Sequence, residues 1–329
     1  SKQHVMAWFT LVSTLVCALA LFLGGLAVSP KVQSLFVFVQ WVNWPPFTWE
    51  APETPSTSWA WWIDRHLGLF NWHCKAHQGL GAELFEVNGS LGIVRGWRLP
   101  RQGTGKRVVL YLHGNAGNIA VHHRVKLYET LTAPPLSCDV VAIDYGGFGA
   151  SDGWWPDEAS AVADALAAWT ALPEGELIVW GHSLGTGIAT GLISSLIECS
   201  TCATPHGLIL EAPFTSVPDV AAFWAEAWPI PGSYLPSLKS FLHERMYAHR
   251  FSTIDRIERI ADVVNIAVLH GVHDDVVPYD QGQLVAQRAN SLLITFQRGH
   301  EDIVNDSTFV PVLSDVFQSW DEQKRNHTQ

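Results

Sequence analysis

The chain has 329 residues, of which 48% are hydrophobic, so it can bury a sizeable core and is not globally disordered. This length suits one large α/β domain with additional segments. The formal net charge of −11 at pH 7 argues against nucleic-acid binding, which requires a basic surface.

The first predicted element is the hydrophobic segment from Val5 to Val28, which contains no charged residue over 24 positions. As a helix it would be about 36 Å long, enough to cross a hydrocarbon core of about 30 Å. A cleaved signal peptide is the alternative, but its apolar region normally has only about 7–15 residues. We therefore predict that residues 1–30 form a single transmembrane anchor, with the lipid bilayer as partner.

The next segment, residues 31–80, is rich in tryptophan and is broken by Pro45 and Pro46. Tryptophan favours the boundary between membrane and water, where its ring is half apolar and its N–H stays hydrated. We interpret this segment as an interfacial collar that holds a soluble domain close to the bilayer. The alternative is a collar that simply packs on the core of that domain.

From about Ala82 onward, short β-rich runs alternate with helical patterns, which predicts a mostly parallel sheet with helices on both faces. This domain would span residues 81–329. The helical patterns cover Asp157–Leu172 and Leu184–Glu198. The predicted strands lie within Arg107–Gly114, Asp139–Gly147, Glu176–His182, Gly207–Phe214, Asn265–Gly271 and Leu292–His300.

One long segment interrupts this alternation at about residues 215–260. It is aromatic, contains several prolines and lies between two predicted strands. An insertion at such a place would cover the strand ends, so we predict a cap or lid.

The cysteines and histidines do not indicate a metal site. Cys199 and Cys202 form a CxxC motif, but no second CxxC completes a zinc site. A disulfide between them remains open for a domain in a secretory lumen. We interpret the close histidine pairs as surface residues, and we predict neither a metal nor another cofactor.

The stretch WGHSLGTG places Ser183 between Gly181 and Gly185, after a predicted strand and before a predicted helix. The pattern G-x-S-x-G at such a junction is typical of a nucleophile elbow, in which a tight turn presents a strained serine. Side chains in place of the two glycines would collide with the neighbouring backbone. Ser183 is therefore the predicted nucleophile.

A serine nucleophile needs a base, and the base needs an acid that orients it. In hydrolases with this elbow, the chain order is serine, acid, histidine. Asp274 or Asp275 follows the strand within Asn265–Gly271, and His300 follows the last strand. Both positions lie just past the carboxyl ends of strands, where parallel sheets bind ligands.

The oxyanion of such a reaction needs two amide donors. The amide of Leu184, directly after the proposed nucleophile, is one candidate. The second should come from the loop YLHGNAGN after an earlier strand. Asn115 is our choice there, with Ala116 as the alternative.

The motifs HGNAGN, AIDYGGFGASDG, GHSLGTG, LEAPFTS, HDDVVP and a late GH occur in this order over roughly residues 90–320. As an ordered set they resemble the α/β-hydrolase-domain serine hydrolases, in particular their membrane-anchored lysophosphatidylserine lipase and monoacylglycerol lipase branch. The resemblance implies Ser183 as nucleophile, Asp274 as acid and His300 as base. In this family the acid lies four residues past the strand-end histidine, here His270, which favours Asp274 over Asp275.

These observations predict an α/β-hydrolase fold with a cap insertion and one N-terminal transmembrane helix. The predicted reaction is hydrolysis of a lipid ester, such as a lysophospholipid or monoacylglycerol, through an acyl-enzyme. An acyl-protein thioesterase and an accessory subunit of a membrane protein complex are the alternatives. The resemblance implies an endoplasmic-reticulum membrane, with a mitochondrial membrane as the alternative.

Overall fold

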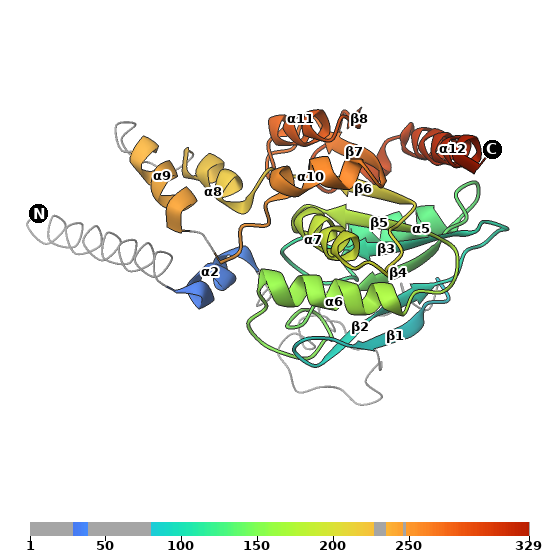
Figure 1. Cartoon of the computed structure of the whole chain (residues 1–329), viewed down its shortest axis with the longest axis horizontal. Helices are drawn as coiled ribbons and strands as arrows, with labels where there is room; N and C mark the ends of the chain where they lie inside the picture. The colour runs from blue at the N-terminus through green and yellow to red at the C-terminus, as the bar shows by residue number, and fades with distance from the viewer. Residues whose placement is uncertain (1–28, 39–79, 227–234, 246–247, 329) are drawn as a thin grey trace, which may run out of the picture.

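The computed structural model describes residues 29–38, 80–226, 235–245 and 248–328 (Figure 1). The predicted anchor from Val5 to Val28 and most of the predicted collar lie outside these ranges. Within them, none of the helices combines the length and the apolar composition that crossing a membrane would require.

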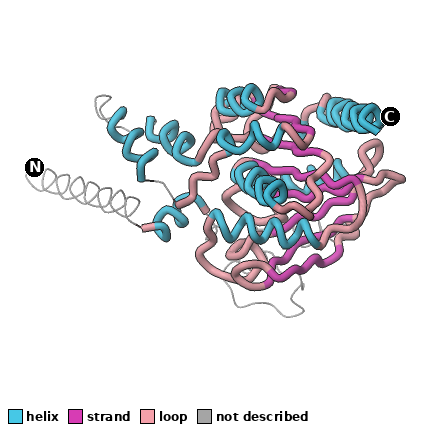
Figure 2. Tube along the Cα trace, in the orientation of Figure 1, coloured by secondary structure: helices cyan, strands magenta, loops and turns pink. Residues whose placement is uncertain are grey.

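The centre of the described structure is a single eight-stranded sheet in the order β1-β2-β4-β3-β5-β6-β7-β8 (Figure 2). Pairing is antiparallel between β1 and β2 and between β2 and β4, and parallel from β4 onward. The strands are β1 (Glu83–Asn88), β2 (Ile93–Leu99), β3 (Arg107–Leu112), β4 (Asp139–Ile143), β5 (Glu176–His182), β6 (Gly207–Glu211), β7 (Asn265–Gly271) and β8 (Leu292–Phe296).

Helices cover both faces of this sheet, as predicted. One face packs against α6 (Glu158–Thr170), α7 (Leu184–Glu198), α10 (Thr253–Ala261) and α11 (Tyr279–Arg288). The other packs against α5 (His122–Thr132) and α12 (Phe309–Thr328). Strand β3 shows why two layers form: Leu110 and Leu112 belong to the first core, whereas Val109 and Tyr111 belong to the second, since successive side chains point to opposite faces.

All six strands predicted from the sequence are present, and the two helical patterns correspond to α6 and α7. The structure adds β1 and β2 at the antiparallel edge. Strand β1 consists of exposed and half-buried residues and includes Glu83 and Glu86, so it lacks the buried apolar run that marks the central strands. Between β6 and β7, the predicted insertion contains α8 (Val217–Glu226), α9 (Leu235–Arg245) and α10.

A short helix from the N-terminal segment, α2 (Pro30–Val37), lies near the start of α6 and the end of α9 in Figure 1. The side-chain amide of Gln33 donates to the carbonyl of Arg245 at 2.6 Å and accepts from the amide of Ala248 at 3.0 Å. The Ser34 hydroxyl donates to the carbonyl of Pro156 at 2.5 Å. This part of the N-terminal segment is therefore hydrogen-bonded both to the insertion and to the loop before α6.

Candidate active site

Ser183 lies at the sharp turn between β5 and α7. Its backbone has φ 52° and ψ −120°, a strained conformation for a residue other than glycine. A Cβ at Gly181 would collide with the carbonyl oxygen of Gly185, and a Cβ at Gly185 would collide with that of Leu112. The steric reason predicted for the two glycines is therefore confirmed.

Asp274 and His300 come together at the carboxyl ends of β7 and β8. The Nδ1 atom of His300 lies 2.7 Å from Oδ2 of Asp274. The other carboxylate oxygen, Oδ1, accepts the amides of Val276 at 2.9 Å and Val277 at 2.8 Å. The ring of His270 faces the same carboxylate, with Nε2 3.3 Å from Oδ2. Asp274 is thus held from three sides and orients the imidazole of His300.

The environment keeps Asp274 ionised. Burial acts to raise its pKa, but the hydrogen bonds from His270 and His300 outweigh burial and hold the pKa well below its usual value. The neighbouring Asp275 is exposed. Of the two carboxylates that the sequence left open, Asp274 is the one in contact with His300.

The residue before Ser183 links the elbow to the loop that carries His300. The Nε2 atom of His182 lies 3.1 Å from the carbonyl oxygen of His300 and donates to it, because a carbonyl can only accept. The two imidazole rings are 4.9 Å apart. Burial and the charge of His300 lower the pKa of His182 well below its usual value, so this side chain is neutral.

The loop after β3 approaches the elbow closely. A Cβ built on Gly114 would lie only 3.3 Å from Cβ of Ser183. The carbonyl of Gly114 accepts a hydrogen bond from Nδ1 of His113 at 2.6 Å. Asn115 follows and is exposed. On the other side of the elbow, Leu184 is the first residue of α7, so its amide has no partner within the helix. Leu184 follows Ser183 directly in the chain, and Asn115 follows the glycine that approaches the Ser183 side chain.

Residues 107–195 match the alpha/beta hydrolase fold family. Lysophosphatidylserine lipase ABHD12 of Danio rerio is 37% identical over 182 residues, which are 54% of this chain and 45% of that protein. The Mus musculus protein of the same name is 29% identical over 293 residues, 84% of this chain and 69% of that protein. The chain thus has the α/β-hydrolase fold and is similar in sequence to these lipases.

The chain spans about half the length of the Danio rerio relative that it matches. Among solved structures, the Pyrococcus furiosus esterase Pf2001 superposes with a TM-score of 0.56 at 17% identity, over 74% of this chain and 94% of that one. That likeness concerns the fold alone.

Two buried charged residues of the candidate active site were not predicted from the sequence. Glu211 ends β6, and its carbonyl accepts the amide of Ser183 at 2.9 Å. Its carboxylate accepts the indole N–H of Trp180 at 2.8 Å. Arg124 lies on the first turn of α5 and is 3% exposed. The only sequence signal for Glu211 was a charged residue at the end of an apolar strand. The only signal for Arg124 was a charged residue soon after a loop motif.

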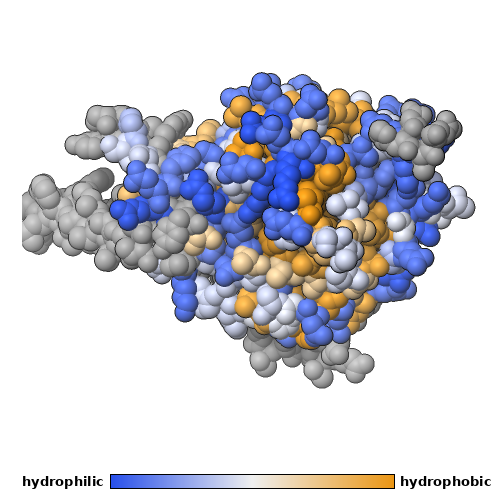
Figure 3. All heavy atoms as spheres, in the orientation of Figure 1, coloured by the Kyte–Doolittle hydropathy of each residue, from blue (hydrophilic) through white to orange (hydrophobic). Residues whose placement is uncertain are grey.

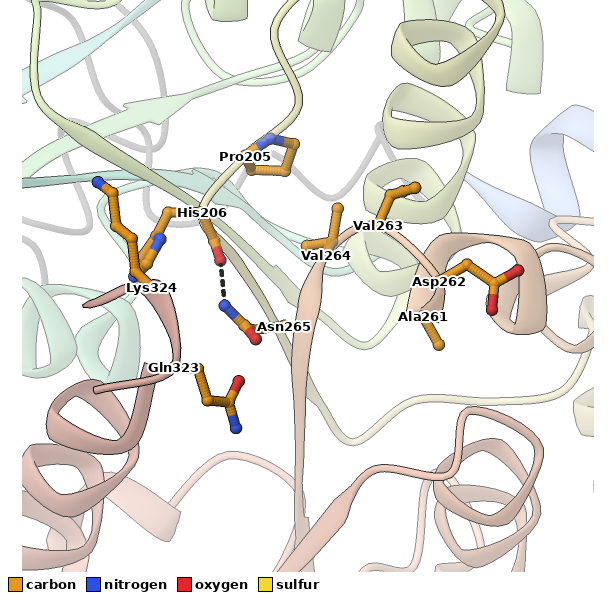
Figure 4. Close-up of a pocket in the computed structure, with 9 residues that line it drawn as sticks. All are labelled: Pro205, His206, Ala261, Asp262, Val263, Val264, Asn265, Gln323 and Lys324. Atoms are coloured by element: carbon orange, nitrogen blue, oxygen red, sulfur yellow. Dashed lines mark hydrogen bonds between the residues drawn. The ribbon is translucent and has the colours of Figure 1, made fainter. Parts of the chain in front are cut away.

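A separate cavity of about 540 Å³ lies at the other end of the sheet (Figure 4). It is lined by the starts of β6 and β7 and by the end of α12, where the side chain of Asn265 donates to the carbonyl of His206 at 2.9 Å. Because Ser183, Asp274 and His300 all follow the carboxyl ends of strands, this cavity is not part of the candidate active site.

Proposed function

We propose that the chain is a membrane-anchored serine hydrolase that cleaves the carboxylic ester of a lysophospholipid or a monoacylglycerol through an acyl-enzyme. The observation that carries the proposal is the 2.7 Å contact between His300 and Asp274 beside the strained turn of Ser183. A strained serine together with an oriented histidine is the arrangement that acyl transfer requires. The similarity to lysophosphatidylserine lipases supports the choice of substrate class.

In the proposed reaction, His300 accepts the proton of the Ser183 hydroxyl as its oxygen attacks the ester carbonyl. Asp274 stabilises the resulting imidazolium, and the amides of Leu184 and Asn115 bind the oxyanion. The imidazolium then protonates the leaving alcohol. In the second half, His300 takes a proton from water, the hydroxide attacks the acyl-enzyme, and the proton returns to Ser183 as the fatty acid leaves.

The proposed organisation places a lipid substrate near this site. Residues 1–30 would form the anchor, residues 31–80 the collar and residues 81–329 the hydrolase domain, with residues 215–260 as a cap. Helix α2 begins at Pro30, the last residue of the proposed anchor, and Gln33 bonds to the segment that follows α9. The insertion would then lie close to the bilayer, an endoplasmic-reticulum membrane in this proposal. Exposed Phe223 and Trp224 on α8 suit such a boundary.

The first test is covalent labelling of the purified full chain with a fluorophosphonate probe, beside a Ser183→Ala control. The proposal predicts labelling that the control lacks. A lipid panel then compares release of fatty acid from lysophosphatidylserine, other lysophospholipids, monoacylglycerol and an acyl thioester. Preference for the thioester would favour a thioesterase. A folded protein that does not react would refute the proposed hydrolysis and favour an accessory subunit of a membrane complex.

Figure 3 shows hydrophobic residues reaching the surface among hydrophilic ones on the face that carries α6 and α7. Trp154 and Trp155, in the loop before α6, are 82% and 44% exposed.

Liposome flotation of the full chain and of a chain that begins at residue 29 tests the proposed anchor. Equal flotation of the two chains would contradict it.

A further inference from the structure

Arg124 is a buried cation next to the candidate active site. It lies on the first turn of α5, directly after the loop that contains Asn115, and is 3% exposed. Its Nη1 donates to the carbonyl of Asn118 at 2.6 Å, and its Nη2 donates to the carbonyl of Ala116 at 2.8 Å. The planar guanidinium thus spans two peptide groups of one loop, a geometry that a lysine cannot reproduce.

These contacts fix the direction of amide groups as well as of carbonyls. In a trans peptide, C=O and N–H point in opposite directions, so holding one oxygen orients the following N–H. The carbonyl of Asn118 is held by Arg124, and the next amide, that of Ile119, donates to Asp144 at 2.9 Å. At the start of the loop, His113 holds the carbonyl of Gly114, which orients the amide of Asn115.

The guanidinium lies close to the nucleophile. A Cβ built on Gly114 would lie 3.3 Å from Cβ of Ser183, 3.5 Å from Nδ1 of His182 and 3.7 Å from Nη2 of Arg124. The loop between them has no room for a side chain at this glycine without movement. A shift of the loop by a fraction of an ångström would therefore move its amides relative to Ser183.

The same turn of α5 also contacts the other two parts of the site. The ring of His123 lies 5.4 Å from that of His182 in the elbow. Its Nδ1 is 3.5 Å from the carboxylate of Glu301, which follows His300. The first turn of α5 therefore holds the loop after β3, the elbow and the loop of the proposed base in a fixed relation.

Burial of this cation is costly. Removing a charged group from water is unfavourable unless hydrogen bonds compensate, and Nε of Arg124 is buried without a partner among the described residues. A well-packed apolar side chain commonly serves stability as well as or better than a buried charge. The arginine at this position is thus better explained by the two carbonyls that it holds than by stability.

We propose that Arg124 is a positioning residue for the proposed hydrolysis, holding the Gly114–Asn118 loop so that its amide donor faces the developing oxyanion. This inference rests on the proposed function. Because the oxyanion exists only in the transition state and the tetrahedral intermediate, loss of the clamp affects kcat more than KM. Removing one oxyanion donor directly costs about 10²–10³-fold in kcat, so misplacing it should cost about 10–100-fold.

The test compares Arg124→Gln and Arg124→Lys with wild type in the full chain. Circular dichroism verifies folding, and fluorophosphonate labelling counts active sites. The expected result for Arg124→Gln is a fall in kcat per site of about 10–100-fold with KM within about twofold. Arg124→Lys, which can reach one carbonyl, should recover part of the loss. Unchanged kcat per site in folded Arg124→Gln would overturn the inference.

Arg107→Gln is the matched control. Arg107 lies at the opposite end of β3, where its guanidinium pairs with Asp321 and lies 4.8 Å from the ring centre of Phe317. Its loss should lower the unfolding midpoint and leave kcat per site within about twofold. An equal loss of kcat in both variants would show a general effect of losing an arginine and refute the positioning role.

Hydrogen exchange of the wild-type protein gives a second measurement that needs no variant. If the loop is held before substrate binds, the amides of Ile119 and Ala120, which donate to Asp144 and to the side chain of Asn118, should exchange slowly in the free protein, on the timescale of β3. Rapid exchange there would contradict the inference even if both Arg124 variants fail to fold. Absence of ester hydrolysis and labelling in wild type would instead refute the proposed function, and the inference with it.

Discussion

Phe38 packs edge-on against Phe251, with ring centroids 5.7 Å apart, although the two residues belong to segments far apart in the sequence. The same ring contacts His249 at 5.8 Å and Phe148 at 6.2 Å. Phe38 is fully buried. The segment that carries α2 is therefore part of the hydrophobic core that covers the sheet.

Replacing this ring should destabilise the domain. Phe38→Ala leaves a cavity among aromatic neighbours, which typically costs about 3–5 kcal/mol of unfolding free energy. Urea denaturation of the full chain measures the loss. Trp154→Ala is the control, because Trp154 is 82% exposed and its removal should change stability by less than about 0.5 kcal/mol. Equal losses in both variants would contradict the packing described for Phe38.

The two adjacent carboxylates should differ sharply in their effect on activity. Asp274→Asn removes the charge that orients His300 and should lower kcat by about 10⁴-fold, as loss of the triad carboxylate does in serine proteases. Asp275→Asn alters an exposed side chain and should change kcat by less than about threefold. Steady-state hydrolysis of one soluble ester by both variants decides the matter, and a reversed order would reject Asp274 as the acid.

Glu211 should make the stability of the folded domain depend on pH. Burial raises its pKa to about 7 from an ordinary value of 4.5, although the hydrogen bond from Trp180 acts in the opposite direction. Between these two values the folded state holds a proton that the unfolded state releases. The contribution of Glu211 to stability is therefore greatest below about pH 4.5 and falls as pH rises toward 7, by on the order of 3 kcal/mol.

Glu211→Gln isolates this contribution, because glutamine retains an oxygen for the indole of Trp180 and does not titrate. Relative to the variant, wild type should lose unfolding free energy between pH 5 and pH 7.5, measured by denaturant titration at each pH. Other carboxylates change stability equally in both proteins and cancel in the difference. Parallel curves for the two proteins would mean that Glu211 is ionised throughout.

The CxxC pair should contribute to stability and not to activity. Cys199 and Cys202 form a disulfide just after α7, whereas Ser183 precedes the start of that helix. Closing so short a loop restricts the unfolded chain by about 2 kcal/mol. A Cys199→Ser, Cys202→Ser double variant should show this loss with kcat unchanged. A reductant should lower the unfolding midpoint of wild type and leave that of the variant in place.

The sequence predicted most of the sheet because its central strands are continuous apolar runs. Asp139–Ile143 and Gly207–Glu211 are buried throughout, as expected for strands covered on both faces. It did not predict β1, β2 or α2. Strand β1 is an edge strand with mixed exposure, and α2 is recognisable as a core element only through its contacts with residues near Phe251.

Local chemistry determined the elbow. A side chain at Gly181 or Gly185 would collide with backbone atoms of the turn itself or of the neighbouring strand β3. Because these collisions are local, the motif alone predicted the turn. The order of serine, acid and histidine along the chain likewise predicted which strand ends meet.

Only the tertiary structure showed the contact of Asp274 with His300, brought Arg124 to the carbonyls of Ala116 and Asn118, and buried Glu211 beside Trp180. These three features depend on contacts between distant segments or on the removal of a charge from water. The pattern of residues along one segment shows neither the contacts nor the removal of the charge. The sequence by itself thus determined the strands, the elbow and the kinds of group around it. Packing determined which charged groups act together, because burial and distance set the strength of their interaction.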